Sequence, residues 1–290
     1  MLEIIKQLRE LNKINKIPLF IAVNQEGGRV NRIPKEFMER IKMDKIAIIA
    51  DIHANLTALN AVLEDIKKRN ISNIYCLGDI VSKSVNPDIV IDIIKEKCEV
   101  VLKGNCDEIF SSERALTRNF WTRMKIGEKR AKFLRELPIM HEFYLSGKLI
   151  RLFHASPYSL EHIYNPIIYN HDERYFNKII TNPIELFNNT EFIGKSKNDK
   201  IPDVIGYAHL HMPNLFQVED KILFNTGSVG ASYSKGEATY TILEGELNSL
   251  KITNMSISNV SVYYNLEKEI KYIEESDIPT KDDIITYLKN

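Results

Sequence analysis

The chain has 290 residues, of which 44% are hydrophobic and 27% charged, a composition typical of a globular protein with room for one α/β domain and insertions. Lysine plus arginine number 39, as do aspartate plus glutamate, so no net basic field favours nucleic acid or an anionic membrane, and we expect neither as a partner. Its apolar runs are shorter than the roughly 18–20 residues that cross a bilayer.

Two further features concern the cellular compartment. The three cysteines, Cys76, Cys98 and Cys106, are too few and too widely spaced for a disulfide framework. The N-terminal stretch from Met1 to Lys6 mixes acidic and basic residues and lacks the apolar core of a signal peptide. The sequence therefore predicts a cytoplasmic protein.

The first 42 residues have a pattern of their own. Apolar residues recur at helical spacing over residues 1–16, and the apolar run 17–23 predicts a short strand that leads into the turn Gly27-Gly28. The pattern starts again after Met43. We therefore predict an N-terminal extension over residues 1–42 and a main domain over residues 43–290.

From residue 46 onward, strands alternate with helices. Apolar runs predict strands over 46–50, 73–77 and 100–102, and helical spacing predicts helices from Leu56 to Arg69 and over 88–97. This alternation is typical of βαβ units around a parallel sheet, in which ligands bind beyond the carboxyl ends of the strands.

The second half of the chain is predicted to be richer in strands. A basic helical stretch over 111–137 ends at Pro138, and strands follow over 150–153, 203–207, 222–225, 238–243 and 249–257. Residues 160–200 are rich in Tyr and Asn without clear periodicity, so we expect an insertion or cap loop there. The tail, residues 266–290, predicts one or two helices broken near Pro279.

Side chains that commonly bind metals follow five of the predicted strands. They are Asp51 and His53, Asp79, Asn105, His154, and His209 and His211. Each motif taken alone is typical of a turn, a helix cap or a strand-end histidine. Together, four imidazoles suit Mn, Fe, Zn or Ni, and the carboxylates supply the negative charge that holds two cations close together. The other histidines, His141, His162 and His171, have no such position.

The ordered series of these motifs resembles the calcineurin-like metallophosphoesterase superfamily, and most of all its small bacterial and archaeal phosphodiesterase branch. The series is Asp51-Ile52-His53, Gly78-Asp79, Gly104-Asn105-Cys106-Asp107, His154 and His209-Leu210-His211. Further matches are Asn55, the run from Phe153 to Pro157, and the run from Asn225 to Gly230. The resemblance extends from about residue 43 to at least residue 255.

The resemblance implies a four-layer α/β/β/α sandwich with two facing mixed β-sheets and a binuclear metal site at the strand ends. Asp51, His53 and His211 would hold one divalent ion, and Asn105, His154 and His209 the other, with Asp79 bridging the two. Mn is the first expectation for both ions, ahead of Fe, Zn or Ni. The turn Gly227-Ser228 would pack behind the last histidine pair.

The implied activity is hydrolysis of a small phosphoester, with phosphodiesters favoured, by a metal-bridging hydroxide that attacks phosphorus in line. Asn105, Cys106 and Asp107 would be the catalytic residues. A protein or nucleotide phosphatase with the same metal site, and a non-catalytic interaction scaffold of the same fold, are the alternatives. Lys103 and Arg151, which precede two of the motifs, either aid phosphate binding or point away from the site.

Three positions depart from the family pattern. Many members have His where Cys106 stands, and a thiol is a poorer acid, which favours substrates with good leaving groups. Ala208 replaces a usual Gly, a mild change provided that the backbone there does not need a positive φ. The loop over residues 80–87 lacks the usual Gly, so we expect its substrate contacts to differ from those of the family.

Residues 17–30 resemble a strand and loop of family 3 glycoside hydrolases that act on N-acetylhexosamines. That family has Asp where Asn24 stands. A (β/α)₈ barrel needs about 250 residues, and the residues after position 42 carry the phosphoesterase motifs instead. Our hypothesis is that residues 1–42 are a fused fragment without glycosidase activity. A chain that begins at Met43 is expected to keep full phosphoesterase activity.

Overall fold

The computed structural model describes residues 43–113, 120–156, 158–161, 163–164, 179–180, 187 and 200–289. The chain divides into two units between Lys42 and Met43. The helix, strand and turn predicted within residues 1–42 lie outside the described residues, and so do most residues of the predicted insertion over 160–200. The fold below is therefore that of the second unit.

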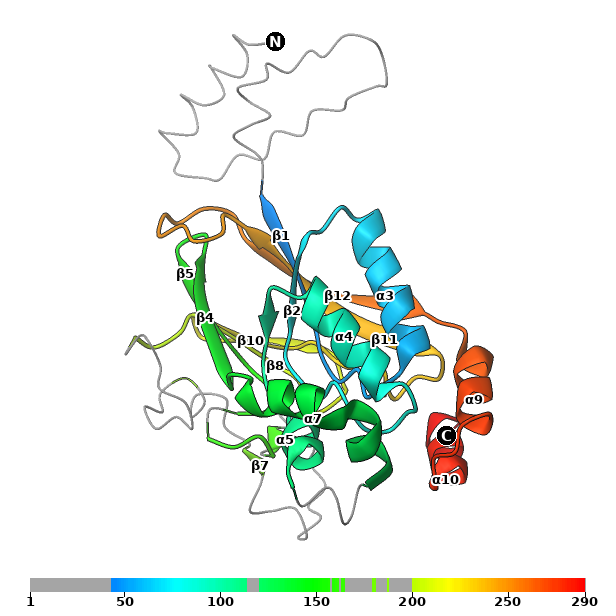
Figure 1. Ribbon diagram of the computed structural model, residues 1–290. Helices are drawn as coiled ribbons and strands as arrows, with labels where there is room; N and C mark the ends of the chain where they lie inside the picture. Colours follow the sequence, from blue (N-terminus) through cyan, green and yellow to red (C-terminus); the bar gives the residue numbers. More distant parts are fainter. Residues whose placement is uncertain are drawn as a thin grey trace, which may run out of the picture. The chain divides into compact units, whose positions relative to one another are not determined.

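Sheet A has five strands in the order β12 (Ser256–Tyr263), β11 (Glu237–Gly245), β1 (Asp44–Ile49), β2 (Asn73–Cys76) and β3 (Val100–Val101). Strands β1, β2 and β3 are parallel, whereas β11 runs antiparallel to both β1 and β12. The sheet is thus mixed, with the predicted βαβ units at one side (Figure 1).

Sheet B also has five strands, in the order β4 (Met140–Leu145), β5 (Lys148–Phe153), β8 (Val204–Tyr207), β10 (Lys221–Asn225) and β9 (Asn214–Val218). The three central strands are parallel, and each outer strand is antiparallel to its neighbour. A separate parallel pair joins β6 (Ile163–Tyr164) to β7 (Ile179–Ile180).

The two sheets pack against each other because β1 is apolar on both faces. Ile46 and Ile48 face sheet B and meet Leu152 and Phe224, while Ile49 faces the helices on the other side. All five side chains are fully buried. This explains why β1 is a continuous apolar run instead of an alternating one.

Helices cover the outer face of sheet A. Helices α3 (Leu56–Lys68), α4 (Pro87–Lys97) and α7 (Phe120–Glu136) contribute to the core on that side, and the short helix α5 (Asn105–Ser111) precedes α7 (Figure 1). Tyr158 and Phe187 pack on the outer face of sheet B. Two facing mixed sheets with helices on the outer face of sheet A confirm the predicted α/β fold class. None of the described helices has the length and apolar surface needed to cross a lipid bilayer.

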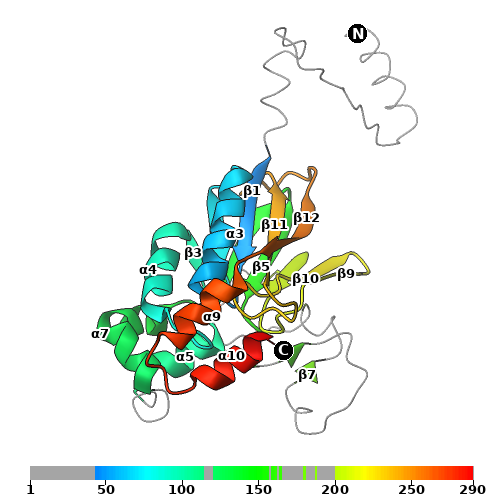
Figure 2. The ribbon, with the colours of Figure 1, turned by 90° about the vertical axis from the view of Figure 1, so that its right-hand side faces the viewer.

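The chain ends in two helices, α9 (Leu266–Glu274) and α10 (Lys281–Lys289), on either side of Pro279. Ile273 and Leu288 of these helices pack against Val85, which lies in the loop after β2. The C-terminal helices therefore lie beside the loops that follow the strands of sheet A (Figure 2).

The observed elements differ from the predicted ones in five cases. Strand β12 begins at Ser256 and not at Ser249, because residues 249–253 bond to the turn at Ser146 and Gly147. Strands β4 and β9 have no regular apolar alternation and were not predicted. Helix α5 begins at Asn105 instead of residue 111. Gly127, at φ 68°, interrupts the helical geometry inside α7.

Candidate metal centre

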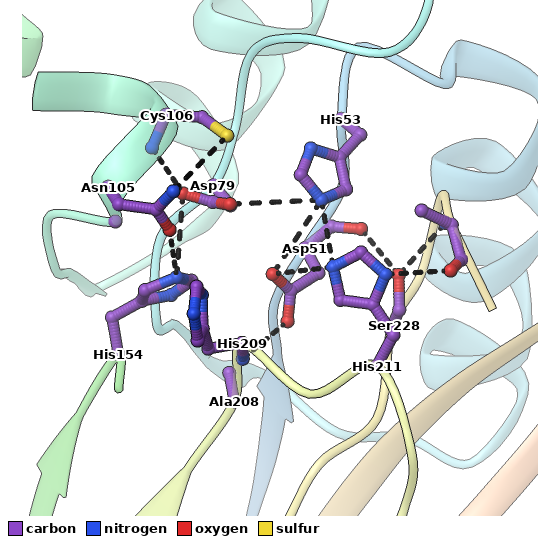
Figure 3. Close-up of polar contacts among 12 residues, drawn as sticks. Asp51, His53, Asp79, Asn105, Cys106, His154, Ala208, His209, His211 and Ser228 are labelled. Atoms are coloured by element: carbon purple, nitrogen blue, oxygen red, sulfur yellow. Dashed lines mark hydrogen bonds and ion pairs between the residues drawn. The ribbon is translucent and has the colours of Figure 1, made fainter. Parts of the chain in front are cut away.

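The five motifs meet at the carboxyl ends of strands from both sheets. Each follows a strand: Asp51 and His53 after β1, Asp79 after β2, Asn105 after β3 as the first residue of α5, His154 after β5, and His209 and His211 after β8. Figure 3 shows their side chains pointing toward one common region. The structure therefore brings together all seven residues that the sequence singles out.

The backbone of these loops adopts an unusual conformation. Asp51, His53, Asp79, His209 and His211 have positive φ values between 49° and 67°. Non-glycine residues rarely adopt this region, and such strain is typical of functional sites. Ala208 is not among the positive-φ residues, so the replacement of the usual Gly is tolerated there.

Two glycines allow the loops after β2 and β3 to touch. A Cβ on Gly78 would lie 2.3 Å from the backbone nitrogen of Gly104, and a Cβ on Gly104 would lie 2.2 Å from Oδ1 of Asp79. Because any larger residue would push these loops apart, the two glycines bring Asp79 and Asn105 within reach of each other.

Asp51, His53 and His211, here called the first cluster, are almost completely buried. The Nδ1 atoms of His53 and His211 lie 3.3 Å and 2.8 Å from the carbonyl oxygens of Val81 and Ala231. A carbonyl only accepts, so each Nδ1 carries the proton and each Nε2 presents a lone pair. These two Nε2 atoms are only 3.0 Å apart, and Nε2 of His211 is 3.3 Å from Oδ1 of Asp51.

Asn105, His154 and His209 form the second cluster. Nδ1 of His154 is bonded to the carbonyl oxygen of Leu77 at 3.0 Å, which leaves Nε2 facing Oδ1 of Asn105 at 3.0 Å. The rings of His154 and His209 lie 5.2 Å apart and nearly perpendicular. His154 is fully buried, whereas Asn105 and His209 are partly exposed.

Asp79 lies between the two clusters. Its Oδ2 is 3.8 Å from Nε2 of His53, and its Oδ1 is 3.5 Å from Nε2 of His154. Oδ1 also accepts a hydrogen bond from the backbone nitrogen of Cys106 at 2.8 Å. One carboxylate thus offers one oxygen to each cluster.

Burial and charge separate the pKa values of the histidines. Burial, followed by the charges of Lys83 and His211, lowers the pKa of His53 well below its ordinary value. Burial, followed by the charge of His154, lowers the pKa of His209 to about 4. For His154 burial acts in the same direction, but the carboxylates of Asp79 and Asp51 outweigh it and raise the pKa. Burial therefore favours the neutral imidazole at His53 and His209, whereas the carboxylates favour a proton on His154.

The segment from Asn225 to Ala231 supports the first cluster from behind. Ser228 Oγ donates to the carbonyl oxygen of Asp51 at 2.8 Å and accepts from the backbone nitrogen of Ala231 at 2.8 Å. The carbonyl of Ala231 in turn faces Nδ1 of His211. The turn at Gly227-Ser228 therefore packs behind the last histidine pair, as the resemblance implies.

Asp107 and Cys106 lie beside the clusters in different ways. Asp107 is fully buried, and its carboxylate accepts hydrogen bonds from the backbone nitrogens of Asp79, Ile80 and Gly104, each at 2.9 Å. Burial and then the charge of Asp79 raise the pKa of Asp107 to about 7. The same two causes raise the pKa of the Cys106 thiol well above its usual range. Asp107 thus links the loops after β2 and β3.

Lys103 and Arg151 point away from the clusters. Lys103 Nζ bonds to Oε2 of Glu108 and to the carbonyl oxygen of Arg135, each at 2.8 Å. Arg151 is buried and pairs with Glu142 on the neighbouring strand. His141 stacks on Phe143 in sheet B, while His162 and His171 lie outside the described residues.

Sequence reasoning missed several groups near the clusters. The carbonyls of Leu77, Val81 and Ala231 hold imidazoles, but a backbone carbonyl leaves no signal in a sequence. Tyr287 reaches the site from α10 and donates a hydrogen bond to the carbonyl oxygen of Ala231 at 3.3 Å. Lys83, whose Nζ lies 5.2 Å from the centre of the Tyr287 ring, was noted only as part of an unusual loop.

The donors of both clusters fit divalent metal ions. In the first cluster the Nε2 lone pairs of His53 and His211 face each other at 3.0 Å and gain from a cation between them. In the second cluster Nε2 of His154 and the amide oxygen of Asn105 lie 3.0 Å apart, and both are atoms that bind cations. Oδ1 of Asp51 is buried and has no hydrogen-bond partner among the described residues, which a bound cation would satisfy. Groups of side chains close enough to share an ion include Asp51, His53 and His211, and Asp79, His154 and His209.

Comparisons with known proteins agree with this geometry. Residues 44–247 match the calcineurin-like phosphoesterase superfamily domain. An uncharacterized protein of Methanocaldococcus jannaschii is 31% identical over 245 residues, covering 81% of this chain and 93% of that protein.

Two solved structures share the fold. A metallophosphoesterase from Sphaerobacter thermophilus aligns with a TM-score of 0.61 and 21% identity, over 86% of this chain and 99% of its own. A hypothetical protein from Pyrococcus horikoshii aligns with a TM-score of 0.61 and 20% identity, over 85% and 98%. From the family match and the archaeal relative together, this chain is a member of the calcineurin-like phosphoesterase superfamily.

Proposed function

We propose that the protein hydrolyses phosphoesters with the help of two divalent metal ions, and that it favours phosphodiesters. The observation that carries the proposal is the position of Asp79, which offers one carboxylate oxygen to each of two clusters of imidazoles. Two adjoining sites that share a carboxylate are what a pair of cations requires.

In this proposal Asp51, His53 and His211 hold one ion, Asn105, His154 and His209 hold the other, and Asp79 bridges them. The donors of this proposed set are nitrogen and oxygen atoms; the Cys106 thiol, whose pKa burial raises, is not among them. This set suits Mn, Fe, Zn or Ni, and we propose Mn first.

When bound, such a pair of ions lowers the pKa of a water from about 15.7 towards about 7 and neutralises charge on a phosphate. The protein's own residues hold the metal-binding side chains in a fixed orientation. The carbonyls of Val81 and Ala231 fix the rings of His53 and His211 in one tautomer. Asp107 fixes the backbone at Asp79. We therefore propose Asp107 as a positioning residue, in place of the catalytic role expected from the sequence.

The surroundings of Cys106 bear on the substrate. Its thiol lies 3.8 Å from Nδ2 of Asn105 and, with a raised pKa, is a weak proton donor at neutral pH. The best substrate is then an ester whose leaving group departs without help from a strong acid. This supports activated esters, and we propose that Asn105 and Cys106 line the face of the site that the ester approaches.

The test is turnover of bis(p-nitrophenyl) phosphate and p-nitrophenyl phosphate with Mn²⁺, Fe²⁺, Zn²⁺ or Ni²⁺ added to the metal-free protein. We expect faster hydrolysis of the diester. His154→Ala is expected to lose more than about 100-fold in kcat/KM, beyond the effect of removing a supporting partner. His141→Ala, a histidine outside both clusters, is the matched control.

Other outcomes would favour the alternatives. Faster hydrolysis of the monoester would favour a phosphatase. Tight metal binding without turnover of either ester would favour a non-catalytic scaffold of the same fold.

We further propose that residues 43–290 form the working domain and that residues 1–42 have no part in the reaction. A chain that begins at Met43 should then retain the kcat/KM of the full chain on the diester. A failure of this shortened chain to fold would contradict the proposal.

A further inference from the structure

A cavity of about 960 Å³ opens between the loop after β2, helix α5, the start of α7 and helix α10. Its lining is mainly aromatic and apolar: Phe110, Phe120, Trp121, Met124, Ile284 and Tyr287. Sites for small molecules usually measure roughly 300–1,000 Å³ and have this kind of lining. The cavity is thus large enough for a group of the size of a nucleoside.

The cavity and the metal centre share one wall. Tyr287 lines the cavity, and its hydroxyl donates to the carbonyl oxygen of Ala231, which also faces Nδ1 of His211. Lys83 lines the cavity too, and it follows by two residues Val81, whose carbonyl oxygen lies 3.3 Å from Nδ1 of His53. A molecule in the cavity therefore lies next to the first cluster.

Lys83 has no anionic partner in the part of the chain that the structure describes. Its Nζ lies over the ring of Tyr287 at 5.2 Å. The ammonium group of a lysine beside two bound cations would be repelled by them unless an anion lies between the lysine and the cations. The position of Lys83 therefore suits a contact with a negatively charged oxygen at the border of the cavity.

The opening of the cavity exposes large apolar side chains. Phe120 and Met124 are each 57% exposed, and concave apolar patches of this kind mark ligand sites. Trp121 is held in place by a 2.7 Å hydrogen bond from its Nε1 to Oδ1 of Asp277. These flat and apolar surfaces are suited to a planar organic group.

We propose that this cavity binds the planar aromatic group of a phosphoester whose phosphate lies at the two clusters, and that Lys83 contacts a phosphate oxygen. The inference rests on the proposed function and adds the substrate class, aryl or nucleoside phosphoesters. Lys83 and the cavity then determine specificity, while the clusters determine reactivity.

Binding is measured directly through Trp121, since the chain has one tryptophan and it lines the cavity. The full chain, with Mn²⁺ bound, is titrated with phenylphosphonate and with methylphosphonate while tryptophan emission is recorded. We expect phenylphosphonate to change the emission and to bind about tenfold more tightly than methylphosphonate. Absence of an emission change with phenylphosphonate would overturn the proposal.

Two pairs of variants test the lining. Met124→Lys is expected to raise the KM for bis(p-nitrophenyl) phosphate about tenfold with little change in kcat. Its control is Ile89→Lys, because Ile89 is 44% exposed on α4 outside the cavity. Lys83→Met is expected to lower kcat/KM about tenfold, with partial recovery in Lys83→Arg. Its control is Lys268→Met, since Lys268 lies over Tyr272 at 5.7 Å on α9.

The two proposals fail in different ways. If the diester is hydrolysed but Met124→Lys and the Trp121 emission show no effect, the cavity assignment is wrong and the proposed function stands. If no ester is hydrolysed with any metal, yet phenylphosphonate changes the emission and Met124→Lys abolishes that change, the cavity assignment stands and the proposed reaction is wrong.

Discussion

The two clusters of the metal centre are built differently. In the first cluster Asp51, His53 and His211 are at most 8% exposed, and both imidazoles are fixed by backbone carbonyls. In the second cluster only His154 is fully buried, and Asn105 and His209 are partly exposed. One cluster is enclosed by backbone, whereas the other is open on one side.

This difference teaches how one site can hold ions tightly and still admit a substrate. Enclosed side chains with fixed tautomers lose little freedom on binding an ion. Partly exposed ones leave a face that a phosphoester can reach. We therefore expect the first cluster to retain its ion more firmly than the second.

The largest effect is expected where the clusters join. Asp79→Asn removes the negative charge from a side chain that lies within 4 Å of both His53 and His154. We expect kcat/KM to fall by more than about 100-fold and both ions to be lost. Metal analysis of the purified variant measures this, and retention of two ions would contradict a shared carboxylate.

Ser228→Ala is expected to affect the first cluster alone. Ser228 Oγ bonds to the carbonyl of Asp51 and to the backbone nitrogen of Ala231, and loss of such supporting partners typically lowers metal affinity by about 10–100-fold. Calorimetric titration with Mn²⁺ should show one of two binding steps weakened. The exposed Ser234→Ala is the control, and equal weakening of both steps would argue against separate clusters.

A fall in pH should release the two ions in order. Protons compete for a ligand below its pKa, so a raised pKa means competition that begins at higher pH. The carboxylates of Asp79 and Asp51 outweigh burial and raise the pKa of His154, whereas burial and the charge of Lys83 lower that of His53. We expect the second cluster to lose Mn²⁺ first, and its affinity for Mn²⁺ to fall about tenfold per pH unit. Binding titrations from pH 8 to pH 5 check this order, which earlier loss from the first cluster would reverse.

The smallest effect is expected at Cys106. Because burial and the charge of Asp79 keep its thiol protonated, it supplies no charge, and Cys106→Ser should change kcat/KM on the activated diester less than about threefold. Steady-state kinetics at pH 7.5 measures this. A loss as large as that of Asp79→Asn would show that the thiol takes part in the reaction.

Some features of the fold could not be predicted from local patterns. Strand β12 is an edge strand whose apolar residues, such as Ile257 and Val260, alternate weakly with polar ones, and its register is set by pairing with β11. Helix α5 begins at Asn105 because the carboxylate of Asp107 accepts a hydrogen bond from the backbone nitrogen of Gly104. In the sequence alone, the same residues are equally typical of a turn. Such boundaries depend on strand-pairing and helix-capping partners, which the periodicity of apolar residues does not reveal.

The sequence by itself determined the alternation of strands and helices from β1 to β3, the six side chains of the two clusters with Asp79, and the family. It does so because parallel strands direct their carboxyl ends to one edge of the sheet, so the residues that follow the strands lie near one another where ligands bind. Only the tertiary structure decided that backbone carbonyls fix the imidazoles and that α10 brings Tyr287 beside Lys83. These contacts join residues as far apart as Lys83 and Tyr287, and such distances in the chain are closed only by packing.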